Sequence, residues 1–187
     1  MIALDIKTHW PDIRQHFKRS FSTNFHVAIA SIDSQGLPVN TPIGSLFLYR
    51  DCRGIYYEKY PSTLPGNVAA HPEICVLAVN SGVWFWLRSL LQNRFYAYPG
   101  IRLHGILGIS RKPSELEKKR LKRRMRATRF LPGNKSLWGD MDSVREIQFT
   151  RAESVQLGSM SSRLNTKQYH KNGISSLLNK ETKREQT

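Results

Sequence analysis

Residues 36–72 have the sequence GLPVNTPIGSLFLYRDCRGIYYEKYPSTLPGNVAAHP, and this stretch decides the fold. Apolar, β-branched and aromatic residues predict one strand over Val39–Tyr49 and a second over Ile55–Lys59, with turn residues between them. A short helix over Thr63–Ala70 follows, and the proline two residues later ends it because helices rarely continue into proline. The segment therefore predicts an antiparallel pair of strands and then a helix.

Further strands and helices are expected on both sides of this segment. Apolar runs and alternation predict strands over residues 25–32, 74–79, 101–109 and 147–155. Trp10, Ile13 and Phe17 recur at helical spacing, and Ser114 with Glu117 forms a capping-box signature that begins a later helix. Residues 83–98 fit either a strand or a helix. About six strands, two to three helices and short hairpin turns favour a mainly β fold, an antiparallel barrel flanked by helices, over a doubly wound sheet.

Positive charge is concentrated in the second half of the chain. The net charge is +15, and residues 101–187 hold 20 basic and eight acidic residues, against nine and six in residues 1–100. The segment Lys118–Arg129 alone contains eight basic residues and no acidic one. Such a density attracts polyanions or acidic lipids.

Length and cysteine content bound the organisation of the protein. A chain of 187 residues fits one domain, which we expect over residues 1–158, followed by a polar tail over residues 159–187 that is mobile or docked at the periphery. Cys52 and Cys75 lack metal spacing, and the start of the chain lacks a secretory signal pattern, so we expect free thiols and a cytoplasmic protein. The longest apolar run, Val83–Leu87, is too short to span a bilayer.

The order of these parts resembles the FMN-binding split barrels related to pyridoxamine 5'-phosphate oxidase over most of residues 12–158. The matching pieces are the strand Val27–Asp33, the Gly36-Leu37-Pro38 turn, the helix end Asn67–Pro72, Gly105 and the closing segment Ile147–Gly158. The resemblance implies an antiparallel split β-barrel. It also implies a homodimer that shapes an FMN pocket at the subunit interface.

The resemblance also implies where FMN would be held. In the oxidase proper, basic residues on the second strand and after the third strand bind the FMN phosphate, and the matching positions here are Thr41, Leu46 and Ser62-Thr63-Leu64. Charged donors bind phosphate more strongly than hydroxyls do, so Arg102 is a further candidate. The candidate FMN-binding residues are Thr41, Pro42, Ile43, Tyr57, Ser62, Thr63 and Arg102. The alternative is that the hydroxyl residues are ordinary strand and cap residues and that Tyr57 packs in the core.

Other chemical signatures are sparse. Arg102 and His104 share a strand face that Leu103 does not, which is typical of a ligand contact or of a pair on a half-exposed strand. Catalytic triads, metal-ligand spacings and Gly-rich phosphate loops are not recognisable in the sequence, so we assign no catalytic residue and no metal ligand. Any redox chemistry would be that of the flavin itself.

Three functions stay open at this point. The first is an FMN-binding split-barrel flavoprotein that acts as an oxidoreductase on a small molecule. The second is a flavin-free barrel that binds nucleic acid or an anionic membrane through Lys118–Arg129. The third is haem binding, for which the sequence nominates no axial ligand.

Overall fold

The computed structural model describes residues 2–58, 63–139, 141–161 and 164. Its strands are β1 (Ile2–Leu4), β2 (Val27–Ile32), β3 (Pro38–Ile43), β4 (Phe47–Leu48), β5 (Arg53–Glu58), β6 (Glu73–Val79), β7 (Gly100–Arg111) and β8 (Ser143–Ser154). Its α-helices are α1 (Ile6–Asn24), α2 (Thr63–Ala70), α3 (Val83–Leu91), α4 (Glu115–Arg124) and α5 (Pro132–Trp138). Most of the expected tail lies outside the described residues. Within them, no helix combines the length and the apolar character needed to cross a bilayer.

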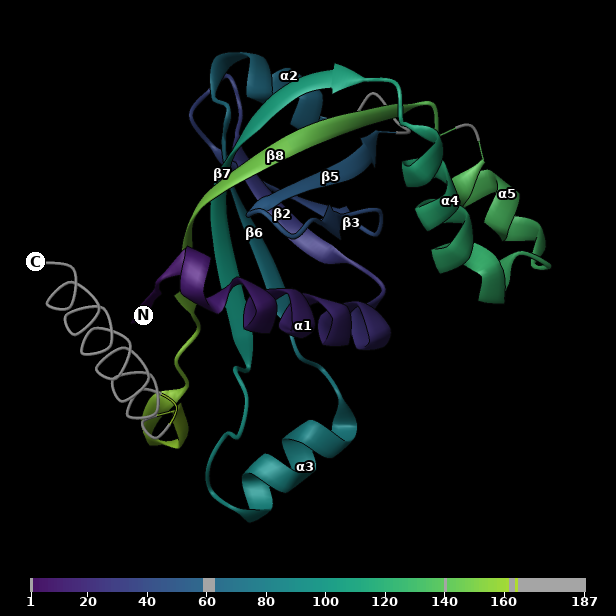
Figure 1. Ribbon diagram of the computed structural model, residues 1–187. Coiled ribbons are helices and arrows are strands. Elements are labelled where there is room, and N and C mark those ends of the chain that lie inside the picture. The colour runs from purple at the N-terminus through teal and green to yellow at the C-terminus, as the bar shows by residue number, and fades with distance from the viewer. Residues whose placement is uncertain (1, 59–62, 140, 162–163, 165–187) are drawn as a thin grey trace, which may run out of the picture.

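The strands form one antiparallel sheet that curls into a split barrel (Figure 1). The strand order is β3-β2-β6-β7-β8-β5-β4, and β1 adds to β8. The two ends of this path, β3 and β4, follow each other in the chain with only residues 44–46 between them, so the sheet turns back on itself. The expected antiparallel barrel is confirmed, with each of the six expected strands present and the short strand β1 added.

The expected strand over Val39–Tyr49 is broken into β3 and β4 at Gly44. A Cβ at this position would lie 2.7 Å from Cη2 of Trp138, so glycine permits a close approach of the chain to α5. The Ser45 hydroxyl then bridges to β5, accepting from the Tyr57 N–H and donating to the Tyr57 carbonyl oxygen, both at 3.1 Å. This kink lets one segment pair with β2 at one end and with β5 at the other.

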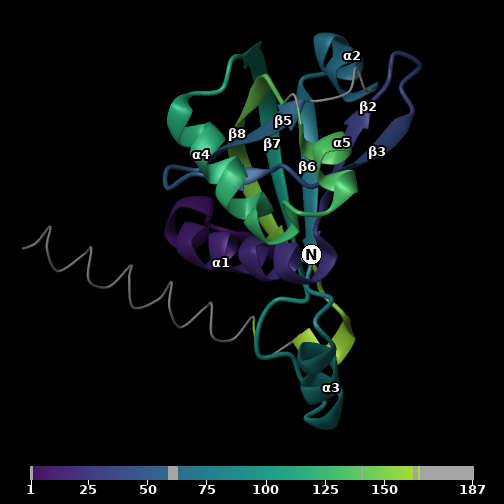
Figure 2. The same ribbon diagram turned by 90° about the vertical axis from the view of Figure 1, so that its right-hand side faces the viewer.

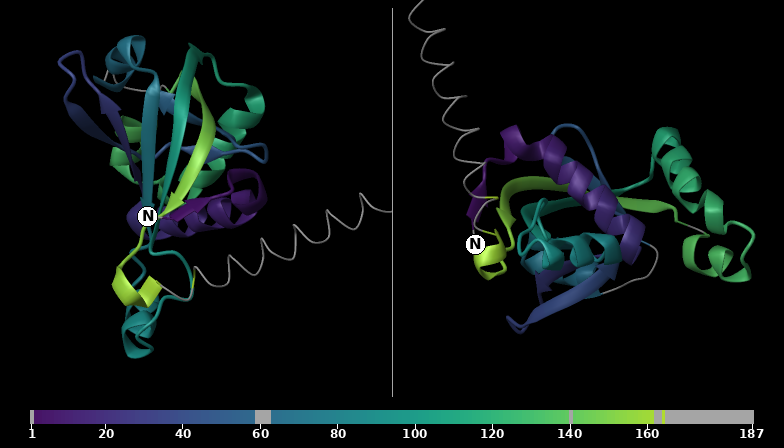
Figure 3. Two further views of the ribbon diagram at one scale, coloured as in Figure 1. Left: turned by 90° about the vertical axis from the view of Figure 1, so that its left-hand side faces the viewer. Right: turned by 90° about the horizontal axis from the view of Figure 1, so that it is seen from below.

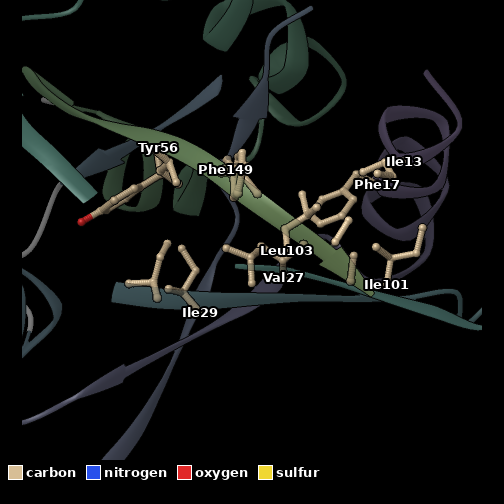
Figure 4. Packing of buried hydrophobic residues seen from close by; sticks show 14 of the residues in the cluster. Ile13, Phe17, Val27, Ile29, Tyr56, Ile101, Leu103 and Phe149 are labelled. Carbon is tan, nitrogen blue, oxygen red and sulfur yellow. The ribbon is translucent and has the colours of Figure 1, made fainter. Parts of the chain in front are cut away.

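Apolar side chains of the sheet and of α1 fill the interior of the barrel (Figure 4). Ile13 and Phe17 of α1 belong to one buried cluster with Ile29 and Leu103 of the sheet, and all four are at most 2% exposed. On α1, Trp10, Ile13 and Phe17 form the buried stripe that the helical spacing predicts. Helix α1 packs mainly on β6, and α2 packs on β2. Within the described residues, these two helices therefore cover only part of the sheet.

Residues 83–98, which fit two kinds of structure in the sequence, form helix α3 and a loop at one end of the molecule (Figures 1 and 2). The rings of Phe85 and Phe95 stack with centroids 5.6 Å apart. The indole of Trp86 donates to the carbonyl oxygen of Asn80 at 2.8 Å. The aromatic residues of this segment thus pack largely on one another, and Trp84 stays 81% exposed.

Candidate functional site

Strands β3, β2, β6 and β7 share an outer face across which no helix runs in the described part of the chain (Figure 3, left). The antiparallel register places Pro42, Ala28, Leu77 and Arg102 in one row on this face. All four are half-buried or exposed. Because opposite residues of paired strands point to the same side, this row is a continuous strip of outward-facing side chains.

The next row of the sheet points into the barrel. It joins Thr41 to Ile29, Val76 and Leu103, of which the last three are fully buried. Ile43, two residues beyond Thr41, also packs against the core. The sequence-predicted residues on β3 are therefore divided between the two faces, with Thr41 and Ile43 inward and Pro42 outward.

Arg102 shares the outer face with Pro42 but is not adjacent to it. Three strand-to-strand steps separate β3 from β7, and at about 4.8 Å for each step the two backbones are about 14 Å apart. A ligand that contacts both residues would have to extend across β2 and β6. This separation suits an elongated molecule rather than a single phosphate group.

A groove of about 400 Å³ is hollowed into the outer face, and we call it the outer-face groove. It is lined by Ala30, Ser31, Ile32, Pro38, Glu73, Ile74, Cys75, His104, Gly105, Ile106 and Thr150. Most of this lining is apolar or small, and burial raises the pKa of the Cys75 thiol. Largely apolar walls with a few polar groups are typical of sites for small molecules and cofactors.

Charged side chains gather beside this groove on β7 and β8. The register pairs Arg102 with Glu153 and His104 with Arg151 on the same face. Glu153 is only 3% exposed; burial opposes its ionisation, but the hydrogen bond from Arg151 and the nearby His104 outweigh burial and lower its pKa. His104 Nε2 lies 3.6 Å from the Glu153 carboxylate and, within the described residues, is buried without a hydrogen-bond partner. In the sequence, the alternation of residues along β7 places Arg102 and His104 on one face. That Arg151 and Glu153 of β8 join them becomes evident only from the pairing of the two strands.

Tyr57 lies on another side of the barrel, beneath α4. It is 3% exposed, packs with Leu121 and Val144, and meets the Phe47 ring edge-on at 6.2 Å. Burial, with the nearby Glu117 carboxylate, raises the pKa of Tyr57 to about 12. Its hydroxyl has no hydrogen-bond partner among the described residues. This position matches the packing alternative for Tyr57 better than a place in the outer-face groove.

The remaining predicted residues, Ser62 and Thr63, stand at the start of α2. Ser62 lies outside the described residues, and Thr63 is described only as the first residue of the helix. Their proposed contact with phosphate stays a prediction.

Helix α4 is attached to the barrel by a buried carboxylate. The Glu117 side chain accepts from both terminal nitrogens of Arg111, at 2.8 and 2.9 Å, from the Ser114 N–H at 2.7 Å and from the Tyr49 hydroxyl. The expected capping box is therefore present and extended. The hydrogen bonds from Arg111 lower the pKa of Glu117 to about 2.

Arg124 is a second attachment that the sequence does not reveal. Its guanidinium donates to the carbonyl oxygens of Leu46 at 2.7 Å and Gly44 at 3.1 Å, where β3 and β4 are broken. It also lies 3.6 Å above the centroid of the Phe47 ring. Burial lowers the pKa of Arg124 to about 10. One of the eight basic residues of Lys118–Arg129 is thus a structural contact rather than a solvated charge.

Comparison with known proteins gives no matching family model and no similar curated protein. Solved structures do match. An FMN-binding protein from Syntrophomonas wolfei has a TM-score of 0.53 at 13% identity, with 81% of this chain and 95% of that chain covered. HupZ from group A Streptococcus has a TM-score of 0.51 at 18% identity, with coverage of 77% and 94%. A candidate pyridoxamine 5'-phosphate oxidase from Lactobacillus delbrueckii has a TM-score of 0.50 at 14% identity, with coverage of 82% and 100%.

The match covers nearly the whole length of each of these structures, although their sequences differ widely from that of this chain. At these low identities, the structural match shows the shared fold alone. The chain therefore has the split-barrel fold found in pyridoxamine 5'-phosphate oxidase-like and FMN-binding proteins.

Proposed function

We propose that this protein is a flavoprotein that binds FMN in the outer-face groove and acts as an oxidoreductase on a small molecule. The observation that carries the proposal is the groove itself, a largely apolar hollow of about 400 Å³ on a bare sheet face. The split-barrel fold and the similarity to an FMN-binding protein support the choice of cofactor. When bound, FMN would supply hydride or electron transfer, and the protein would supply position and electrostatics.

The residues that line the groove suit the ring of FMN better than its phosphate. Ile32, Pro38 and Ile106 offer apolar contact to a planar ring. The phosphate needs cations, and on this face they are Arg102 and Arg151, on β7 and β8. Leu46, which matches a position of a basic phosphate-binding residue in the oxidase family, is fully buried in the core and does not contact a ligand in the groove. We therefore assign the phosphate contact to the β7 side, with Arg102 as its main cation.

The proposal includes a homodimer formed through the outer face. Ile32 is 41% exposed and Ile106 is 46% exposed on this face, which also carries the half-buried Leu77. A second copy of the chain would cover these apolar side chains and exclude water from the groove. The FMN ring would then lie between subunits, as the family resemblance implies.

Titration of the apoprotein with FMN, followed by quenching of flavin fluorescence, tests the site. Arg102→Gln should raise the Kd by about 10- to 150-fold, because a charge-assisted hydrogen bond contributes about 1.5 to 3 kcal/mol. Arg88→Gln on α3 removes the same charge far from the groove and should leave the Kd unchanged. Equal effects of the two substitutions would refute the assignment of Arg102. If Ser62→Ala with Thr63→Ala leaves the Kd unchanged, those hydroxyls do not hold the phosphate.

A further inference from the structure

A second cavity of about 780 Å³ lies between α1, the β4–β5 turn and α4, and we call it the α1–α4 groove. Figure 2 shows the turn between the two helices. Its basic lining comes from all three elements, with Arg14 and Lys18 on α1, Arg50 on the turn, and Arg120 and Arg123 on α4. These residues are far apart in the sequence, so the charge count of α4 alone does not reveal the groove.

Two other arginines of this groove are already engaged. Arg53 forms an ion pair with Asp51 at 2.5 Å, and Arg124 is bound to the carbonyl oxygens at the β3–β4 break. In contrast, the five residues Arg14, Lys18, Arg50, Arg120 and Arg123 have no carboxylate partner within the part of the chain that the structure describes. Like charges converging on one cavity raise its positive potential and favour an anionic ligand.

The shape of the groove narrows the choice of anion. Five cations from three elements match several phosphates in a row better than one phosphate group. A concave site also suits a linear polyanion better than the flat surface of a membrane. A volume of about 780 Å³ is roughly 9 Å on a side. The major groove alone of a DNA duplex is about 12 Å wide, so a whole duplex is too wide to enter the cavity. A single strand fits these dimensions.

We propose that the α1–α4 groove binds the phosphodiester backbone of a single-stranded nucleic acid. The Tyr49 ring in the groove is already covered by the Arg120 guanidinium, 5.2 Å from its centroid. It is therefore not offered to a base, and the contact depends on phosphates rather than on sequence. The proposal is independent of FMN, because the groove lies apart from the outer face.

The test is fluorescence anisotropy of a labelled 12-nucleotide DNA strand of mixed sequence, measured with the full chain at several salt concentrations. Each phosphate contact to a single strand contributes about −0.7 to the slope of log K against log salt. Five contacts predict a slope of about −3.5, and Arg14→Gln with Arg120→Gln should reduce its magnitude by about 1.4. The Kd at 0.1 M salt should rise about 25-fold. Arg14→Lys with Arg120→Lys should retain the slope of the native protein.

The matched control removes the same number of charges, both of them from α4. Lys119→Gln with Lys122→Gln removes two charges of α4 that do not line the groove, and it should leave the slope unchanged. Equal losses in the groove pair and the control pair would refute the groove and assign binding to net charge. Absence of salt-dependent binding by the native protein would also refute it. So would binding to phosphatidylglycerol vesicles but not to the oligonucleotide. Circular dichroism of each variant identifies any loss that comes from unfolding.

Discussion

At the scale of single residues, the role of a charge is decided by where its head group lies. Arg124 belongs to a run of eight basic residues, yet its guanidinium is buried against Phe47 and two backbone carbonyls. A long aliphatic stem lets arginine cross apolar surface before it finds its acceptors. The pattern of the sequence does not distinguish it from its solvated neighbours.

We predict that Arg124→Met lowers the free energy of unfolding by about 2 to 3 kcal/mol, because the carbonyl oxygens of Gly44 and Leu46 lose a charged donor. Arg123→Met, one residue away and exposed, should change it by less than about 0.5 kcal/mol. Urea denaturation at neutral pH measures both. Similar values for the two variants would show that Arg124 does not hold α4 to the barrel.

Glu117 gives a pH-dependent prediction. Its pKa is lowered from the ordinary 4.5 to about 2, so its ionised form stabilises the folded state at every pH above 4.5. As the pH falls from 4.5 toward 2, the unfolded chain takes up a proton that the folded chain does not, and this contribution is lost.

Glu117→Gln should therefore lower the free energy of unfolding by about 2 kcal/mol at pH 7. The difference from the native protein should shrink between pH 4.5 and pH 2. Urea denaturation at a series of pH values measures it, and Glu115→Gln, an exposed neighbour, should have a far smaller effect. A difference that stays constant down to pH 2 would contradict the role assigned to Glu117.

At the scale of elements, β7 shows where the backbone itself is the constraint. A Cβ at Gly105 would lie 2.6 Å from the carbonyl oxygen of Gln148 and 3.1 Å from Phe149, at an irregularity in the pairing of β7 with β8. A Cβ at Gly108 in the same strand would make only ordinary contacts, 3.6 Å or longer.

We predict that Gly105→Ala lowers the free energy of unfolding by about 2 kcal/mol, because the neighbouring strand must move. Gly108→Ala should lie within about 0.5 kcal/mol of the native protein. Thermal or urea denaturation measures the pair. If Gly105→Ala leaves the free energy of unfolding unchanged, β7 and β8 are not held as closely at this position as the register requires.

Elements were more predictable from the sequence than the site was. The six strands follow from apolar alternation and turn residues, and α1 follows from its buried stripe. The break at Gly44 was not predictable, because it depends on Trp138, which comes almost 100 residues later. The faces of Thr41 and Pro42 were also undetermined. On β3, the exposed Pro38, Asn40 and Pro42 alternate with the half-buried Val39, Thr41 and Ile43, but neither row is fully buried, so the inner side is only weakly marked.

At the scale of the whole molecule, the outer face and the α1–α4 groove lie on different parts of the barrel. The outer-face groove is largely apolar, and no helix of the described residues crosses it, whereas the α1–α4 groove is strongly basic. The elements and their short turns predicted an antiparallel barrel. The resemblance of their order to a known family implied the split barrel. The two grooves were not predictable, because each gathers residues from distant strands or helices.

The most direct test of the central proposal is size-exclusion chromatography of the protein after incubation with FMN, with light scattering and absorbance recorded together. We expect one peak with twice the 21.6 kDa mass of a single chain. That peak should also carry flavin absorbance at about 450 nm. A peak at the mass of one chain, with no absorbance near 450 nm even after incubation with excess FMN, would contradict the account.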